Sequence, residues 1–219
     1  METPVTPAEL VPDIAILAKA PIAGLAKTRL SPALGAAGAA QLQARLTQHT
    51  VQTALAARLG PVTLWCTPDV EHPHFQAIAA EHGVACRPQV EGDLGARMQA
   101  VFQAACAPRP RILLGTDCPA LQTADLHQAA TLLTRGLDAV FQPAEDGGYV
   151  LVGLRRPCLP LFEDMPWSTA EVMALSRERA RRHGLQWEEL PMRWDVDLPQ
   201  DLARLREQAS LQHLLQDLP

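Results

Sequence analysis

Aromatic residues are scarce in this chain of 219 residues, since Phe, Trp and Tyr together make up only 4% of it. So low a share argues against the stacking platforms on which proteins bind single-stranded nucleic acid. Basic residues are outnumbered as well, with a formal net charge of −5 at pH 7, which argues against broad binding to a phosphate backbone. We therefore expect no nucleic acid among the partners, although a local basic cluster could hold a small phosphorylated ligand.

The sequence also lacks targeting and redox signals. No apolar stretch is long enough to span a membrane as a helix, and residues 1–12 have neither the cationic start nor the apolar centre of a signal peptide. The five cysteines are odd in number and include no C-x-x-C pair, which is typical of reduced thiols in a cytosolic protein. We expect a cytoplasmic protein without a membrane partner, and we expect residues 1–12 to be flexible.

The chain does have an ordinary hydrophobic share, 47%, and a length that suits one α/β domain. Short apolar runs alternate with segments of helical periodicity through the first two-thirds. This alternation predicts a mainly parallel central sheet with helices on both faces. No low-complexity linker divides the chain, so we predict one domain over residues 1–219. The expected strands cover residues 13–20, 62–66, 84–87, 111–116, 139–143, 149–154 and 187–190.

Helix signals lie between these strands. A helix is expected over residues 94–107, and Gly83, Gly136 and Gly184 are expected to end three others. The segment Ser168–Glu171 has the pattern of a capping box. Pro199 suits the first turn of the last helix.

One carboxylate closes the apolar run that ends at Thr116. Asp117 is followed by Cys118 and Pro119, and proline cannot donate a hydrogen bond to a neighbouring strand, so the strand must end there. In an open α/β sheet the carboxyl ends of the strands face the ligand crevice, where a carboxylate can hold Mg²⁺ against phosphate oxygens. Asp117 could instead cap the turn before the next helix.

Three cations surround the first strand-to-helix connection, namely Lys19, Lys27 and Arg29. Gly24 and two prolines keep this segment a loop. Cations in a loop at this edge of a sheet can cradle a diphosphate or a triphosphate, although their spacing does not match a P-loop. A solvated cationic loop is the competing interpretation.

The segment Gly92–Met98 opens a helix. Asp93 is a good N-cap residue, and that role alone could explain it. Alternatively, the glycines let a ligand approach the backbone at a helix N-terminus, and Arg97, one turn further on, reaches a phosphate or a base. Asp93 and Arg97 are therefore candidate nucleotide-binding residues.

Between two expected strands lies the segment Asp146, Gly147 and Gly148. Asp-Gly is a strong signal for a hairpin turn, and a turn alone would account for these residues. Two glycines exceed what a turn needs, so we favour a tight loop that binds substrate and presents Asp146 to the second substrate.

The remaining acidic candidates are Asp195 and Asp197. Alternation in an extended segment puts both carboxylates on the same side, and one of them could complete a metal site with Asp117. Asp197 is close enough to cap the helix that follows. We therefore favour Asp195 as the metal ligand, while Asp197 stays a candidate.

Five segments carry a family resemblance, and they occur along the chain in this order: AKAPIAGLAKTRL, GDLGARM, LLGTDCPAL, DGGYVLVGL and WDVDLPQDL. On these segments the chain resembles, from Ile14 to Leu205, a bacterial family provisionally labelled glycosyltransferases or nucleotide-diphospho-sugar transferases, found beside radical-SAM and selenium-related genes. That family looks like a compact GT-A superfamily member related to phospholactate guanylyltransferase and the molybdenum-cofactor nucleotidyltransferases. The resemblance implies a single Rossmann-like GT-A domain, with Asp117 at the position of the metal-binding aspartate.

The resemblance leaves three functions open. Asp117 stands in Thr-Asp-Cys-Pro where a glycosyltransferase often has Asp-x-Asp, and the segment Lys27–Arg29 is similar to the phosphate loop of nucleotidyltransferases. We therefore favour nucleotidyl transfer from an NTP to a phosphorylated small molecule with Mg²⁺ or Mn²⁺ bound, and expect Asp117, Asp146 and Lys27 to be catalytic. The alternatives are glycosyl transfer from an NDP-sugar to a small acceptor, with Asp146 as the base, and a non-catalytic nucleotide sensor.

Overall fold

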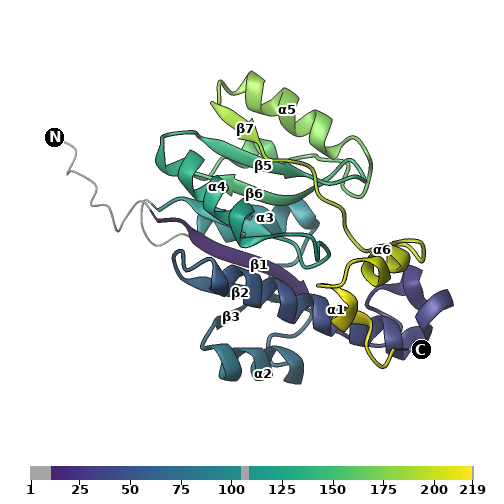
Figure 1. Ribbon diagram of the computed structural model, residues 1–219. Coiled ribbons are helices and arrows are strands. Elements are labelled where there is room, and N and C mark those ends of the chain that lie inside the picture. The colour runs from purple at the N-terminus through teal and green to yellow at the C-terminus, as the bar shows by residue number, and fades with distance from the viewer. Residues whose placement is uncertain (1–10, 105–108, 219) are drawn as a thin grey trace.

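The computed structural model describes residues 11–104 and 109–218 (Figure 1). Most of the segment expected to be flexible, residues 1–12, lies outside the described residues, as does the expected end of the helix over residues 94–107. The central sheet has seven strands in the order β3-β2-β1-β4-β6-β5-β7. They are β1 (Asp13–Lys19), β2 (Val62–Thr67), β3 (Ala85–Pro88), β4 (Arg111–Leu114), β5 (Ala139–Pro143), β6 (Tyr149–Leu154) and β7 (Trp187–Glu189).

Strand β6 makes the sheet mixed, because it runs antiparallel to both of its neighbours, β4 and β5. The other neighbouring strands pair in parallel. The predicted α/β class and mainly parallel sheet are therefore confirmed, and the antiparallel strand comes from the β5–β6 hairpin.

Helices cover both faces of the sheet, as predicted (Figure 1). The described helices are α1 (Ser31–Ala56), α2 (Pro73–His82), α3 (Leu94–Gln103), α4 (Thr123–Thr134), α5 (Val172–Arg182) and α6 (Asp201–Glu207). Successive residues of a strand point to opposite faces, so Ile14 and Ile16 of β1 pack in the core beneath α1, α2 and α4. Ala15 packs in the core beneath α3 and α5. A third cluster joins α6 to α1 through Leu202, Leu205 and Leu42.

Two predicted helix starts are wrong. Helix α5 begins only at Val172 and has no side-chain cap, because Ser168 has a φ of +65° and the residues after it form a turn against the β5–β6 hairpin. Helix α6 begins at Asp201, so Pro199 lies in the preceding turn instead of in the first helical turn. Both segments belong to the loops that surround the candidate site.

Strand β4 ends at Leu114, two residues earlier than predicted. Thr116 therefore already lies in the loop, where Gln43 donates a hydrogen bond to its hydroxyl at 3.0 Å. That buried contact from α1 fixes the residue immediately before Asp117.

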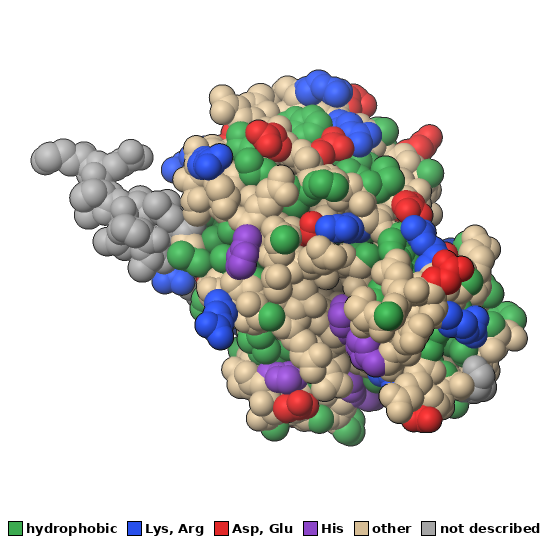
Figure 2. Space-filling model, in the orientation of Figure 1, with side chains coloured by type: hydrophobic (Ala, Val, Ile, Leu, Met, Phe, Trp, Pro, Cys, Tyr) green, Lys and Arg blue, Asp and Glu red, His purple; other side chains and the backbone are tan. Residues whose placement is uncertain are grey.

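Charges of both signs alternate over the face of the molecule shown in Figure 2, which carries no continuous basic area. None of the helices in residues 11–104 and 109–218 is both long and apolar enough to cross a membrane.

Candidate functional site

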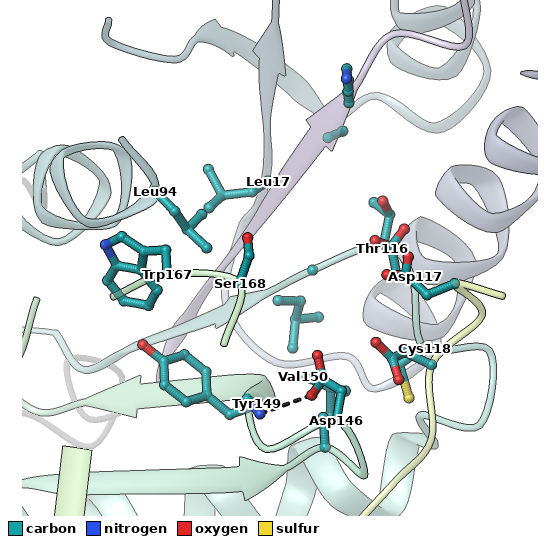
Figure 3. A pocket seen from close by; sticks show the side chains of 18 of the residues that line it. Leu17, Leu94, Thr116, Asp117, Cys118, Asp146, Tyr149, Val150, Trp167 and Ser168 are labelled. Carbon is teal, nitrogen blue, oxygen red and sulfur yellow. Dashed lines mark hydrogen bonds between the residues drawn. The ribbon is translucent and has the colours of Figure 1, made fainter. Parts of the chain in front are cut away.

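A cavity of about 520 Å³ opens at the carboxyl ends of β1 and β4. The chain proceeds from β1 to β2 and β3 on one side and then returns to place β4 on the other side of β1. The strand order therefore reverses between β1 and β4, which is where open α/β sheets bind their ligands. Figure 3 shows Asp117, Cys118 and Asp146 toward one end of this cavity and Leu94, Tyr149 and Trp167 toward the other.

Four predicted carboxylates line this cavity together: Asp117, Asp146, Asp195 and Asp197. They come from the loop after β4, the β5–β6 hairpin and the segment after β7. The N–H of Val196 donates to the carbonyl oxygen of Asp117 at 2.8 Å, which holds the last segment beside the first. The spatial convergence follows from the fold, whereas the spacing in the sequence only suggested it.

Asp195 shows how strongly these charges act on one another. Burial, together with the negative charges of Asp146, Asp197 and Asp117, raises the pKa of this carboxyl to about 6. Such a cluster favours binding of a positive charge, because a cation would relieve both the desolvation and the mutual repulsion.

The cavity carboxylates suit a divalent cation only when a bound ligand supplies further coordinating oxygen atoms. Among residues 11–104 and 109–218, no group of three or more His, Cys, Asp or Glu side chains is arranged to hold a metal ion alone. Mg²⁺ is commonly held by one or two carboxylates together with substrate phosphates and water. Asp117 and Asp195 would supply the carboxylates of such a site, with nucleotide phosphates completing the coordination.

Lys27 lies against the carboxylates, not in an open phosphate loop. Its side chain is 4% exposed, and its ammonium lies 2.9 Å from Asp117 and 3.2 Å from Asp197. It also donates to the carbonyl oxygen of Val196. Burial alone lowers the pKa of Lys27, but the two carboxylates more than offset this and hold its pKa above the ordinary value.

Asp197 does not cap the last helix, so that expectation is wrong. Its carboxylate contacts Lys27 and, at 3.0 Å, the exposed Arg29. The carboxylate of Asp201, on the helix itself, accepts hydrogen bonds from the N–H groups of Asp197 and Leu198 instead. Asp201, in the first turn of α6, therefore accepts these backbone hydrogen bonds, and the carboxylate of Asp197 faces the cavity beside Lys27 and Arg29.

Two other cavity-lining cations, Lys19 and Arg97, differ from Lys27 and Arg29. Within the described part of the chain, neither has a carboxylate within 4.0 Å of its charged group. The Nε atom of Arg97 is buried without a hydrogen-bond partner there. Lys19 and Arg97 are therefore the cations best placed to bind an anionic ligand.

Asp93 has the structural role that the sequence allowed. Its carboxylate caps α3 by accepting a hydrogen bond from the N–H of Ala96 at 2.8 Å. The close approach at Gly95 is made by the protein itself, because an added Cβ would lie 2.5 Å from the carbonyl oxygen of Phe162 and 2.9 Å from Nε1 of Trp167. The idea that this glycine leaves space for a ligand is therefore wrong.

Of the other predicted glycines, Gly24 and Gly147 adopt turn conformations with a positive φ, and Gly148 lines the cavity. Gly24 has a φ of +79° and an open surrounding, so it serves the turn after β1. Gly147 has a φ of +90°, and an added Cβ would lie 2.3 Å from the carbonyl oxygen of Ala170. Gly148 lines the cavity, and its N–H donates to the carboxylate of Asp146 at 2.8 Å. The turn is thus a hairpin that also fixes Asp146.

Residues of the apolar end were missed by sequence reasoning. Trp167 and Tyr149 line the cavity, but a single Trp after a proline and a Tyr at the start of a strand match no binding motif. Cys118 is buried, which raises the pKa of its thiol to about 12, so it is not a reactive nucleophile.

Comparison with known proteins supports this fold. A structure of a provisionally named nucleotide-diphospho-sugar transferase from Desulfovibrio desulfuricans G20 is 28% identical, with 94% of each chain covered and a TM-score of 0.80. A cytidylyltransferase from Leptospira borgpetersenii is 15% identical, with 90% of this chain and 86% of that chain covered and a TM-score of 0.60. No protein of curated function matches the chain significantly.

A glycosyltransferase shares the fold as well. Glucosyl-3-phosphoglycerate synthase from Mycobacterium tuberculosis, in complex with Mn²⁺, UDP and glucosyl-3-phosphoglycerate, is 10% identical, with 95% of this chain and 80% of that chain covered and a TM-score of 0.53. The fold is thus one that nucleotidyltransferases and glycosyltransferases share. A model of the family described as "Uncharacterized protein conserved in bacteria (DUF2064)" matches residues 50–169, more than half of the sequence, and the chain therefore belongs to this family.

Proposed function

We propose that the protein is a metal-dependent transferase with a nucleotide donor. One observation carries the proposal: carboxylates from three separate segments converge on a single cavity at the reversal point of the sheet, and the pKa of Asp195 rises to about 6. The fold shared with nucleotide-using transferases supports it.

In this proposal Asp117 and Asp195 hold Mg²⁺ or Mn²⁺ together with the donor phosphates. Bound there, the metal ion would neutralise the charge that develops on the leaving phosphate oxygen. Lys19 binds the same phosphates. Lys27 keeps Asp117 and Asp197 in place through its two ion pairs, so its contribution is positioning.

We propose an NDP-sugar as the donor. The preference for an NTP rested in part on the cationic segment Lys27–Arg29 after β1, but Lys27 and Arg29 are paired with Asp117 and Asp197. Fewer free cations suit a diphosphate better than a triphosphate. The acceptor oxygen would bond to the anomeric carbon, the bond from that carbon to the phosphate oxygen would break, and Asp146 would take the acceptor proton.

Nucleotidyl transfer is the second candidate, because the chain has no Asp-x-Asp at Asp117: the positions two residues before and after it are Gly115 and Pro119. In that reaction an acceptor phosphate oxygen would bond to the α-phosphorus of an NTP, and pyrophosphate would leave. No general base is needed, since the attacking phosphate is already ionised.

The products distinguish the candidates. The full chain with Mn²⁺ should be incubated with a panel of nucleotide sugars and nucleoside triphosphates, and nucleoside diphosphate and pyrophosphate should be measured separately. Asp117→Asn tests the site, and Asp164→Asn is the control, because Asp164 is an exposed aspartate outside the cavity.

We expect Mn²⁺-dependent release of a nucleoside diphosphate that Asp117→Asn abolishes and Asp164→Asn retains. Pyrophosphate release would identify the second candidate. Nucleotide binding without either product would indicate a sensor, and absence of nucleotide binding would contradict the proposal as a whole.

A further inference from the structure

One end of the cavity is built from apolar side chains that donor binding does not use. Leu17, Leu94, Met98, Tyr149 and Trp167 line it, and we call this set the Trp167 wall. Figure 3 shows four of them, all but Met98, gathered on the side away from Asp117. Leu94 is 42% exposed, although apolar side chains of its size are usually buried.

The Trp167 wall is preformed. Nε1 of Trp167 lies so close to Gly95 that even a Cβ there would be 2.9 Å from it, which fixes the indole against the start of α3. The ring of Tyr149 packs on Phe141 with 5.7 Å between the centroids, and its hydroxyl contacts Sδ of Met98 at 3.8 Å. A flat ligand would therefore meet a rigid surface and order few side chains on binding.

A cation adjoins this apolar surface. Leu94 and Arg97 are three residues apart on α3 and so lie on the same side of the helix, and both line the cavity. Arg97 has no carboxylate partner in the described part of the chain, and its buried Nε has no hydrogen-bond acceptor there. An anionic group on the ligand would satisfy this guanidinium.

The position of the wall in the sheet indicates which substrate it meets. Tyr149 begins β6, three residues after Asp146, and β6 lies on the far side of β4 from β1, β2 and β3. A donor with its phosphates at Asp117 and Lys19 would extend toward β2 and β3, where Thr67 and Gln89 line the cavity. The Trp167 wall and Asp146 then face the other substrate.

We infer that the Trp167 wall binds the acceptor, and that the acceptor carries a flat apolar ring with an anionic group beside it. The word acceptor rests on the proposed function; the ligand chemistry rests on the wall alone.

Ligand-observed NMR on the full chain tests this without turnover. The probes are 4-hydroxybenzoate, which has the ring and the charge, phenol, which has the ring alone, and glycerol 3-phosphate, which has the charge alone. We expect 4-hydroxybenzoate to bind most tightly. Trp167→Leu and Leu94→Ser should weaken both ring-bearing probes at least about fivefold. Met192→Ser is the matched control, because Met192 is 59% exposed and lies outside the cavity.

Arg97→Gln should abolish the difference between 4-hydroxybenzoate and phenol while phenol binding persists. The inference is overturned if glycerol 3-phosphate binds more tightly than both ring-bearing probes, if no ring-bearing probe binds up to its solubility limit, or if the Trp167 and Leu94 variants bind like the Met192 control.

Addition of UDP with Mn²⁺ separates the inference from the proposed function. We expect the bound probe to remain when the nucleotide binds. Displacement of the probe by the nucleotide would assign the wall to the donor and overturn the inference while leaving the proposed function intact. Probe binding without any nucleotide binding would contradict the proposed function and leave the ligand chemistry of the wall standing.

Discussion

Gly147→Ala should be among the most damaging small substitutions in the protein. The glycine has a φ of +90°, and the added Cβ would lie 2.3, 2.6 and 2.7 Å from three backbone atoms of Ala170. Backbone atoms cannot rotate away as the end of a side chain can, so the hairpin and the segment before α5 must separate. That movement also stretches the hydrogen bond from the N–H of Met173 to the carbonyl oxygen of Gly147, now 2.8 Å.

The magnitude follows from two contributions. A left-handed conformation costs an L-residue roughly 1–3 kcal/mol, and loss of one backbone hydrogen bond costs about 0.5–1.5 kcal/mol. We therefore expect the free energy of unfolding to fall by about 2–4 kcal/mol, measured by urea denaturation with the slopes compared.

Gly136→Ala is the matched control for this substitution. Gly136 also has a positive φ, +106°, but an added Cβ there would meet nothing within 4 Å, so only the conformational cost applies. The reasoning is refuted if Gly147→Ala is no more destabilising than Gly136→Ala.

Two further predictions concern the charges of the site. The pKa of Asp195, raised by burial and by its neighbours to about 6, lies above that of the unfolded chain, so its contribution favours the folded state below about pH 4 and is lost as the pH rises through about 6. Thermal melts of the metal-free protein should therefore show Asp195→Asn more stable than wild type at about pH 8, and no gain there would contradict this. Lys27→Ala should lower the free energy of unfolding by roughly 1–3 kcal/mol, since charged hydrogen bonds are lost while the cost of burying the ammonium disappears. Arg29→Ala should cost less than about 1 kcal/mol, because an exposed ion pair contributes little, and equal losses in urea denaturation would refute the distinction.

Local sequence rules predicted the elements whose signals are local. Strands β5 and β6 have the predicted bounds, because apolar runs flank an Asp-Gly turn. His72 and Gly83 flank α2 in cap positions. The capping box at Ser168 failed because the contact of Ala170 with Gly147 is distant in sequence and decides the local conformation.

Long-range contacts also explain what the sequence could not predict about the site. The four predicted carboxylates line one cavity, and the sequence could suggest this because each follows a strand or lies in a turn. The pairing of Lys27 with Asp117 and Asp197 joins residues far apart in the chain, and no spacing rule reports it. The position of Trp167 could not be predicted for the same reason, because its indole packs in the space that Gly95 leaves by having no Cβ.

Mn²⁺ binding followed by electron paramagnetic resonance tests most directly whether Asp117 forms a metal site with a nucleotide. The signal of free Mn²⁺ should fall when wild-type protein and UDP are both present, and fall much less with either alone, because residues 11–104 and 109–218 supply too few ligands without phosphates. Asp117→Asn should lose the UDP-dependent fall while the protein stays folded in a thermal melt, since Asp117 is 47% exposed and an Asn side chain can still accept a hydrogen bond from Lys27. If Asp117→Asn instead binds Mn²⁺ with UDP as tightly as wild type does, Asp117 is not a metal ligand and the proposed site is wrong.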